Sequence, residues 1–223
     1  MNKMDETVNT YENIFAEYKD SFNQEYLNGH VQFQEEIDNL VNLLDDESYI
    51  LDVGTCMGSY PKYLTENVNK NFKVLGIDAS AKMIEEAKKN AKNALFRVMD
   101  MRDMQLDDNS FDAIICLATL IHVDDENASI VLDKFNALLK IEGIMVINVQ
   151  EVSDGIKEIY EDEPLNPKYK TYFNRYTKDF FYEWARNKNY EVIEVIDNYV
   201  NDVKAIGAPN GTKNRFSFIM RKK

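Results

Sequence analysis

Five short apolar runs alternate with amphipathic segments through the middle of this chain, and this alternation limits the fold more than any other feature. The runs are Tyr49–Val53, Phe72–Ile77, Leu95–Met99, Phe111–Leu117 and Ile144–Val149. The amphipathic segments between them include a helix that begins near Ser59, a helix capped by Ser80 and a helix from Ile130 to Leu139 closed at Gly143. Strands alternating with helices of this length form βαβ units. The sequence therefore predicts an α/β fold with a doubly wound, mostly parallel sheet and helices on both faces.

The two ends of the chain add to this core. Apolar residues at helical spacing predict two N-terminal helices before Leu44. At the other end, a helix from Thr177 to Arg186 precedes two strands, Tyr190–Tyr199 and Phe216–Met220, and the tight-turn pair Asn210-Gly211 lies between them. We expect a seven-stranded sheet that ends in an antiparallel hairpin. One domain spans the chain: an N-terminal helical cap (1–44), a ligand-binding core (45–150), a lid-like insertion (151–176) and the C-terminal helix and hairpin (177–223).

The charge of the chain narrows its partners. It carries 39 acidic and 26 basic side chains, which give a net charge of -13. Nucleic-acid binding usually takes clustered Lys and Arg, and here the basic residues are scattered, so we expect a small-molecule partner. No apolar run approaches the roughly 20 residues of a membrane span, and the N-terminus is polar, so we expect a cytoplasmic protein. Two cysteines and two histidines without ligand spacing predict no metal site.

A glycine-bearing loop, ILDVGTCMG, follows the first predicted strand. The acidic residue Asp52 stands near the end of that strand, and Gly54 and Gly58 flank a tight turn into a helix, where backbone N–H groups can approach a ligand closely. About 20 residues further on, the second predicted strand ends at Asp78, whose carboxylate can accept both hydroxyls of a ribose. This pairing indicates a ligand that contains adenosine.

The spacing of the loop separates two kinds of adenosine ligand. A dinucleotide-binding loop needs G-x-G-x-x-G, and Cys56 and Ser59 stand at two of those glycine positions. The observed acidic-x-Gly-x-x-x-Gly pattern instead resembles motif I of class I methyltransferases. The resemblance continues through IDASAKMIEEAKKN, RVMDMRDM, NSFDAIICLATLIHV and LLKIEGIMVINVQE, and it covers about residues 11 to 150.

The resemblance implies S-adenosylmethionine as cofactor and methyl transfer to a small-molecule acceptor by in-line displacement. It implies that Asp78 binds the ribose, that Asp100 meets the adenine amino group and that Met101 covers the ring. The segment YENIFAEY resembles the helix that closes over the cofactor in this family. The residues expected at the cofactor are Tyr11, Tyr18, Asp52, Gly54, Thr55, Cys56, Gly58, Asp78, Ala79, Met83, Asp100, Met101 and Leu117.

Two positions depart from the family pattern. Family members usually have Gly where Cys56 stands, so we expect the thiol to crowd the approach to the amino-acid part of the cofactor. Ile141-Glu142-Gly143 replaces the common Pro-Gly-Gly, a change that we expect to be structurally harmless.

The acceptor side is less sharply defined. His122 follows the fourth predicted strand and faces the crevice in the family pattern, which makes it the candidate catalytic base. It could equally cap or pack the next helix. The segment from Glu151 to Tyr176 is the most aromatic and least regular part of the chain, and we expect it to cover the acceptor. Its expected contacts are Tyr160, Tyr172 and Arg175, although these side chains could also pack the connection against the sheet.

Two other functions remain open at this stage. One is a methyltransferase that acts on a macromolecule such as tRNA or protein. The other is a non-catalytic binding protein with this fold, a reading that Cys56 in the loop keeps open. The sequence does not specify the acceptor or the oligomeric state.

Overall fold

A computed structural model describes residues 3–25, 31–152, 154–198 and 214–223, apart from the side chains of residues 21–25. Its helices are α1 (Lys3–Asn13), α2 (Phe15–Glu25), α3 (Gln34–Leu43), α4 (Ser59–Glu66), α5 (Ala81–Asn90), α6 (Asp125–Leu138) and α7 (Lys178–Asn187). Two short 3₁₀ turns are η1 (Met101–Asp103) and η2 (Leu120–His122). The strands are β1 (Tyr49–Val53), β2 (Lys73–Asp78), β3 (Leu95–Val98), β4 (Phe111–Leu117), β5 (Leu139–Gln150), β6 (Glu158–Asp162), β7 (Lys170–Asn174), β8 (Tyr190–Asn198) and β9 (Arg215–Lys222).

Seven of these strands form one sheet in the order β3-β2-β1-β4-β5-β9-β8. The first five are parallel, whereas β9 runs antiparallel between β5 and β8. This arrangement confirms the predicted doubly wound sheet with an antiparallel C-terminal edge. The pair Asn210-Gly211 lies outside the described residues.

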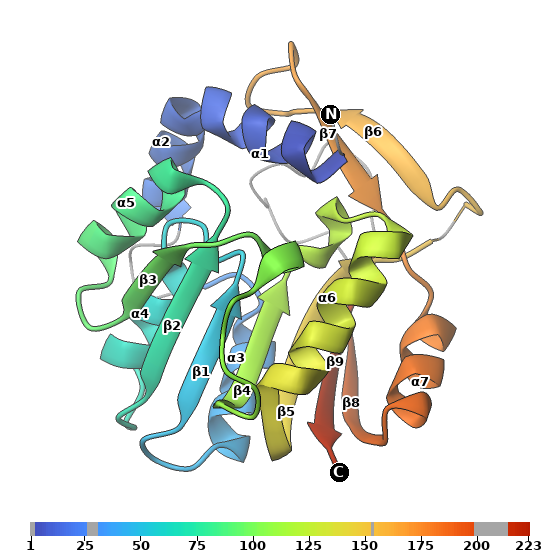
Figure 1. Cartoon of the computed structure of the whole chain (residues 1–223). Helices are drawn as coiled ribbons and strands as arrows, with labels where there is room; N and C mark the ends of the chain where they lie inside the picture. The colour runs from blue at the N-terminus through green and yellow to red at the C-terminus, as the bar shows by residue number, and fades with distance from the viewer. Residues whose placement is uncertain (1–2, 26–30, 153, 199–213) are drawn as a thin grey trace.

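Helices pack on both faces of this sheet (Figure 1). On one face, α6 and α7 cover a core that includes Leu51, Leu75 and Phe218. On the other, α3 and α4 cover a core that includes Ile50, Val74 and Ile115. Successive strand residues point to opposite faces, so Ile50 and Leu51 enter different cores, and the strand runs are apolar throughout because both faces are buried.

Helix boundaries differ from the predicted ones in two places. The first of the two predicted N-terminal helices is divided in the structure into two helices, α1 and α2, which meet at Ile14. The helix expected from Ile130 begins at Asp125, because Asp124 caps it by accepting from the Asn127 N–H at 3.1 Å. Gly143 does not close that helix, which ends at Leu138. It lies inside β5, beside Glu142 with a φ of 63°, where the register with β4 shifts.

The segment expected to be irregular is an antiparallel ribbon of β6 and β7. It lies beside α1 above the carboxyl ends of the parallel strands (Figure 1). Lys3 of α1 pairs with Glu158 at 2.6 Å, and the hydroxyl of Thr10 donates to the carbonyl of Lys170 at 3.2 Å. The N-terminal helix and the ribbon therefore meet over the sheet edge where open α/β folds bind ligands.

Candidate functional site

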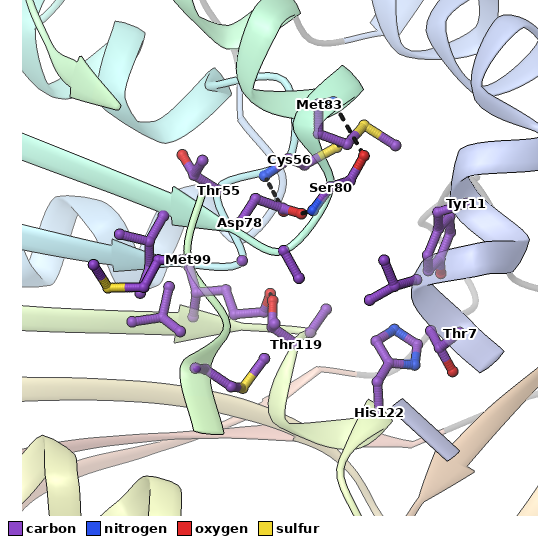
Figure 2. Close-up of a pocket in the computed structure, with 18 of the residues that line it drawn as sticks. Thr7, Tyr11, Thr55, Cys56, Asp78, Ser80, Met83, Met99, Thr119 and His122 are labelled. Carbon is purple, nitrogen blue, oxygen red and sulfur yellow. Dashed lines mark hydrogen bonds between the residues drawn. The ribbon is translucent and has the colours of Figure 1, made fainter. Parts of the chain in front are cut away.

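A cavity of about 170 Å³ lies at the carboxyl ends of β1, β2 and β4. Its floor comes from the loops that follow these strands, and α1 forms its opposite wall (Figure 2). Tyr18 of α2 also lines the cavity. Ten of its lining residues were expected from the sequence: Tyr11, Tyr18, Gly54, Thr55, Cys56, Asp78, Ala79, Met83, Met101 and Leu117. His122 lines it as well.

The carboxylate of Asp78 is the charged group in the wall. It accepts hydrogen bonds from the backbone N–H of Cys56 at 3.0 Å and of Ser80 at 2.9 Å. Burial raises its pKa, and these two hydrogen bonds act in the opposite direction. A carboxylate offers about four acceptor positions, so two remain for the hydroxyls of a ligand.

Gly54 and Gly58 serve packing inside the protein. Gly54 has a φ of 74°, and a Cβ there would lie 2.2 Å from Cγ2 of Thr119, the residue that follows β4 and also lines the cavity. A Cβ at Gly58 would meet Ala87 of α5 and Phe96 of β3. Gly58 does not line the cavity, and with a φ of 83° it lets the loop turn into α4.

Asp52 lies beneath the loop and not in the cavity wall. It is 1% exposed and accepts a hydrogen bond from the Thr55 hydroxyl at 2.5 Å. Burial raises the pKa of Asp52 to about 7, and the Thr55 hydroxyl lowers it again in part. Asp52 therefore holds Thr55, and through it the loop, in place.

Three methionines, Met83, Met99 and Met101, provide apolar surface next to Asp78. The neighbouring Asp100 does not line the cavity. Its carboxylate accepts from Nη2 of Arg102 at 2.6 Å and caps η1. Burial tends to raise the pKa of Asp100, but the hydrogen bonds with Arg102 outweigh it and hold that pKa below its usual range. In this conformation Met101 faces the ligand space while Asp100 is paired with Arg102.

Cys56 has a left-handed backbone, with a φ of 50°. Its sulfur lies 3.7 Å from that of Met83, beside Tyr11 and Tyr18. Burial raises the pKa of the thiol to about 12, so it stays protonated at neutral pH and is not a nucleophile.

His122 ends η2 and faces the cavity next to Tyr11 and Thr7 (Figure 2). Its Nδ1 lies 3.0 Å from the carbonyl oxygen of Tyr172. Because a carbonyl only accepts, Nδ1 carries the hydrogen, and Nε2 of the neutral ring is a hydrogen-bond acceptor. Burial lowers the pKa of His122 to about 4. The ring is therefore neutral at physiological pH.

Tyr160, Tyr172 and Arg175, the expected acceptor contacts, do not line the cavity. Tyr160 is 48% exposed, and its hydroxyl donates to Glu6 at 3.1 Å. Tyr172 is the cross-strand partner of Tyr160 on the same face of the ribbon, and its buried ring packs on that of Tyr160. Arg175 pairs with Asp154 at 3.0 Å. Tyr160 therefore contacts α1, and Tyr172 contacts His122 through its backbone carbonyl.

Sequence reasoning missed several lining residues because their positions depend on how elements meet. They are Met4, Thr7, Val8, Gln32, Val53, Ser59, Tyr60, Ile77, Ser80, Met99, Ala118 and Thr119. Thr7 and Val8 lie one helical turn before Tyr11, so the face of α1 marked by Tyr11 could have indicated them.

The residues present fit an adenosine ligand. A half-buried carboxylate with spare acceptor positions lies between methionine and aromatic surfaces in one cavity. Within the described ranges, no group of three or more His, Cys, Asp or Glu side chains gathers in a way that could hold a metal ion. No helix of the described residues is long and apolar enough to cross a membrane.

Comparison with known proteins identifies the fold. A family model described as "Methyltransferase domain" matches residues 50–143, which run from β1 into β5. A methyltransferase from Burkholderia thailandensis, solved with 1,6-didemethyltoxoflavin and S-adenosylhomocysteine, has a TM-score of 0.70 at 15% identity. That match covers 97% of this chain and 87% of the other.

Two curated proteins are also similar to this chain in sequence. The phosphoethanolamine N-methyltransferase of Triticum aestivum is 32% identical over 50% of this chain, but the match spans only 22% of that longer protein. The carboxy-S-adenosyl-L-methionine synthase of Nautilia profundicola is 24% identical over 81% of this chain and 74% of its own length.

The left-handed backbone of Cys56 leads to a first prediction. Cys56→Gly should bind S-adenosylhomocysteine as tightly as the parent or more tightly, because the loop keeps its path and loses a side chain in the wall. Stability should change by less than about 1 kcal/mol, since relief of the left-handed strain offsets the added chain entropy. Calorimetry and urea unfolding measure both quantities. Cys56→Ala, which keeps the Cβ, is the matched control, and a marked loss of affinity in the glycine variant alone would contradict this account.

The environment of His122 leads to a second prediction, which concerns pH. The folded protein should titrate His122 near pH 4, whereas the unfolded chain titrates it near 6.5. The unfolded state therefore binds the proton first, and this contribution to stability is complete above pH 6.5 and lost as the pH falls toward 4. At pH 5 the loss should be about 1–2 kcal/mol. Histidine NMR measures the midpoint, His122→Asn assigns the signal against His30, and a midpoint near 6.5 would contradict the prediction.

Proposed function

We propose that this chain is a class I S-adenosylmethionine-dependent methyltransferase and that it transfers the methyl group of this cofactor to a small-molecule acceptor. The observation that carries the proposal is the placement of Asp78 and His122 in the wall of one enclosed cavity. Asp78 ends β2, where an adenosine ribose would lie, and His122 follows β4, two strands along the sheet. One space thus offers a cofactor end and an acceptor end.

The cofactor, when bound, supplies a methyl group on a positively charged sulfur, which leaves as a neutral thioether. The protein then has to align the acceptor with this methyl group and keep water out. Asp78 would hold the ribose, while Met99 and Met101 would pack on the adenine side. Tyr11 and His122 would lie beside the acceptor.

His122 acts in this scheme through its Nε2 atom. With Nδ1–H bound to the Tyr172 carbonyl, Nε2 can accept the hydrogen of an acceptor O–H or N–H and orient its lone pair toward the methyl group. A ring with a pKa of about 4 does not keep the proton at neutral pH. We therefore assign His122 to orienting the acceptor and passing its proton to solvent.

A small acceptor is supported by helix α1, which covers the cavity and is called the cover below. Met4, Thr7, Val8 and Tyr11 of α1 form part of the wall. A volume of about 170 Å³ is below the roughly 300–1,000 Å³ of typical ligand pockets, which supports a movement of α1 when cofactor and acceptor enter. A large macromolecular acceptor would have to keep this cover open.

Polar contacts at both ends of α1 hold this helix over the cavity in the closed position. Glu12 accepts from the hydroxyl of Ser80 and pairs with Lys82. Asp5 pairs with Arg102 at 2.6 Å, and Lys3 pairs with Glu158 of the ribbon. Exposed pairs of this kind contribute little energy each, which suits a cover that opens and closes. We propose that the ribbon acts as the support on which α1 closes.

A third prediction tests the cofactor end. Asp78→Ala should weaken S-adenosylhomocysteine binding at least about tenfold, because each hydrogen bond to the carboxylate contributes about 1.5–3 kcal/mol. Isothermal titration calorimetry measures the affinity, and circular dichroism checks that the variant folds. Asp133→Ala, which removes an exposed carboxylate of α6, is the control and should bind as the parent does. Equal affinity in a folded Asp78→Ala variant would reject Asp78 as a cofactor contact.

A fourth prediction tests the cover. Saturating S-adenosylhomocysteine should slow hydrogen exchange of the α1 amides at least about tenfold, because the ligand binds the closed state. The amides of α7, on the far edge of the sheet, serve as the internal control and should not change. If α1 exchanges at the same rate with and without the ligand, α1 is an ordinary packing helix.

A further inference from the structure

The acceptor end of the cavity, the part beside His122, has few charged side chains near it among the described residues. Among the residues of its wall, as far as the chain is described, Asp78 is the carboxylate and neither Lys nor Arg is present. The rest of the acceptor end consists of aromatic, methyl-bearing and hydroxyl side chains, namely Tyr11, Thr7, Val8, Ala118 and Thr119. Moving an ion into such a space without a counter-charge costs several kcal/mol.

Two charged groups outside this wall act on Tyr11 in opposite directions, and one of them, Arg215, also lowers the pKa of His122. Burial and the nearby carboxylate of Glu163 raise the pKa of Tyr11, whereas Arg215 lowers it. Glu163 is 3% exposed and accepts from the hydroxyl of Thr171 at 3.0 Å. Arg215 donates to Oδ1 of Asn148 at 3.3 Å. Neither side chain lines the cavity, so neither provides a contact ion for a bound molecule.

The wall does offer one directed polar contact. Nε2 of His122 is an acceptor on a ring that faces the cavity, because the Tyr172 carbonyl holds the hydrogen on Nδ1. The ring of Tyr11 packs edge-on against His122, with centroids 5.7 Å apart. A flat molecule that donates one hydrogen to Nε2 and lies along Tyr11 would match both groups.

We propose that the methyl acceptor is an uncharged, planar small molecule whose nucleophile is an O–H or N–H group that donates to Nε2 of His122. This inference rests on the proposed function. It disfavours acceptors whose recognised part is a carboxylate, a phosphate or an ammonium group, because the described residues of the wall offer no charged partner for them at the acceptor end.

The test uses one-ring probes of similar size on the full chain saturated with S-adenosylhomocysteine. Phenol is neutral and has the donor, anisole is neutral without it, benzoate is an anion and benzylamine is a cation. NMR titration should show phenol binding at least about tenfold more tightly than benzoate or benzylamine, and more tightly than anisole. His122→Phe keeps a ring but removes the acceptor nitrogen, so it should abolish the difference between phenol and anisole.

The outcomes separate the two proposals. Failure of S-adenosylhomocysteine to bind the parent protein would contradict the proposed function itself. Cofactor binding with benzoate or benzylamine preferred, or with no phenol binding, would overturn only the present inference. Arg215→Gln distinguishes the source of any anion preference. It should leave phenol affinity within about twofold of the parent, and a loss of benzoate binding in this variant would assign an anion site to Arg215.

Discussion

The carboxylate of Asp78 joins the parts of the molecule that surround the cavity. One oxygen holds the loop after β1 through the Cys56 N–H, and the other holds the turn into α5 through the Ser80 N–H. Ser80 in turn caps α5 and donates to Glu12 at the end of α1. A single half-buried side chain therefore connects the loop and α5 directly, and α1 through Ser80. Because the same carboxylate is the expected ribose contact, a ligand there completes a network that already exists, which reduces the cost of ordering the site on binding.

Two ionisable groups at this sheet edge, Asp52 and His122, make the stability of the fold depend on pH in opposite directions. Asp52, with a pKa of about 7, keeps its proton where the unfolded chain has lost it, so its contribution declines as the pH rises through 7. His122 stays neutral where the unfolded chain is protonated, so its contribution declines as the pH falls. The neutral forms of both groups coexist only in a window between about pH 4 and 7. This follows from desolvation in both cases, since burial disfavours the charged form of an acid and of a base alike.

The sequence predicted the parts of the fold that depend on local pattern. β1 and β4 have the predicted bounds, and Ser80 caps α5, because apolar runs and capping residues act within a few positions. It also indicated Asp78 and His122, since Asp78 ends the second predicted strand and His122 lies five residues after the fourth. It did not predict the ribbon of β6 and β7, whose pairing depends on contact with α1. Nor did it show that Asp100 would face Arg102, or that the space beside Gly54 belongs to Thr119, because these outcomes depend on side chains from separate segments.

Two residues with a strained backbone lie in the wall of the cavity, a feature typical of ligand sites. Of the seven non-glycine residues with positive φ among those described, two line the cavity, Cys56 after β1 and Ala118 after β4. These strands are neighbours, so the strained residues lie on adjacent loops at the floor. Each is held by a hydrogen bond, from the Cys56 N–H to Asp78 and from the Ala118 N–H to the Asn148 carbonyl. A left-handed residue of this kind costs about 1–2 kcal/mol, and such strain clusters at ligand sites where the surrounding structure fixes the backbone. Cys56 therefore holds a left-handed backbone that glycine adopts readily, and the hydrogen bond to Asp78 fixes it at the floor of the cavity.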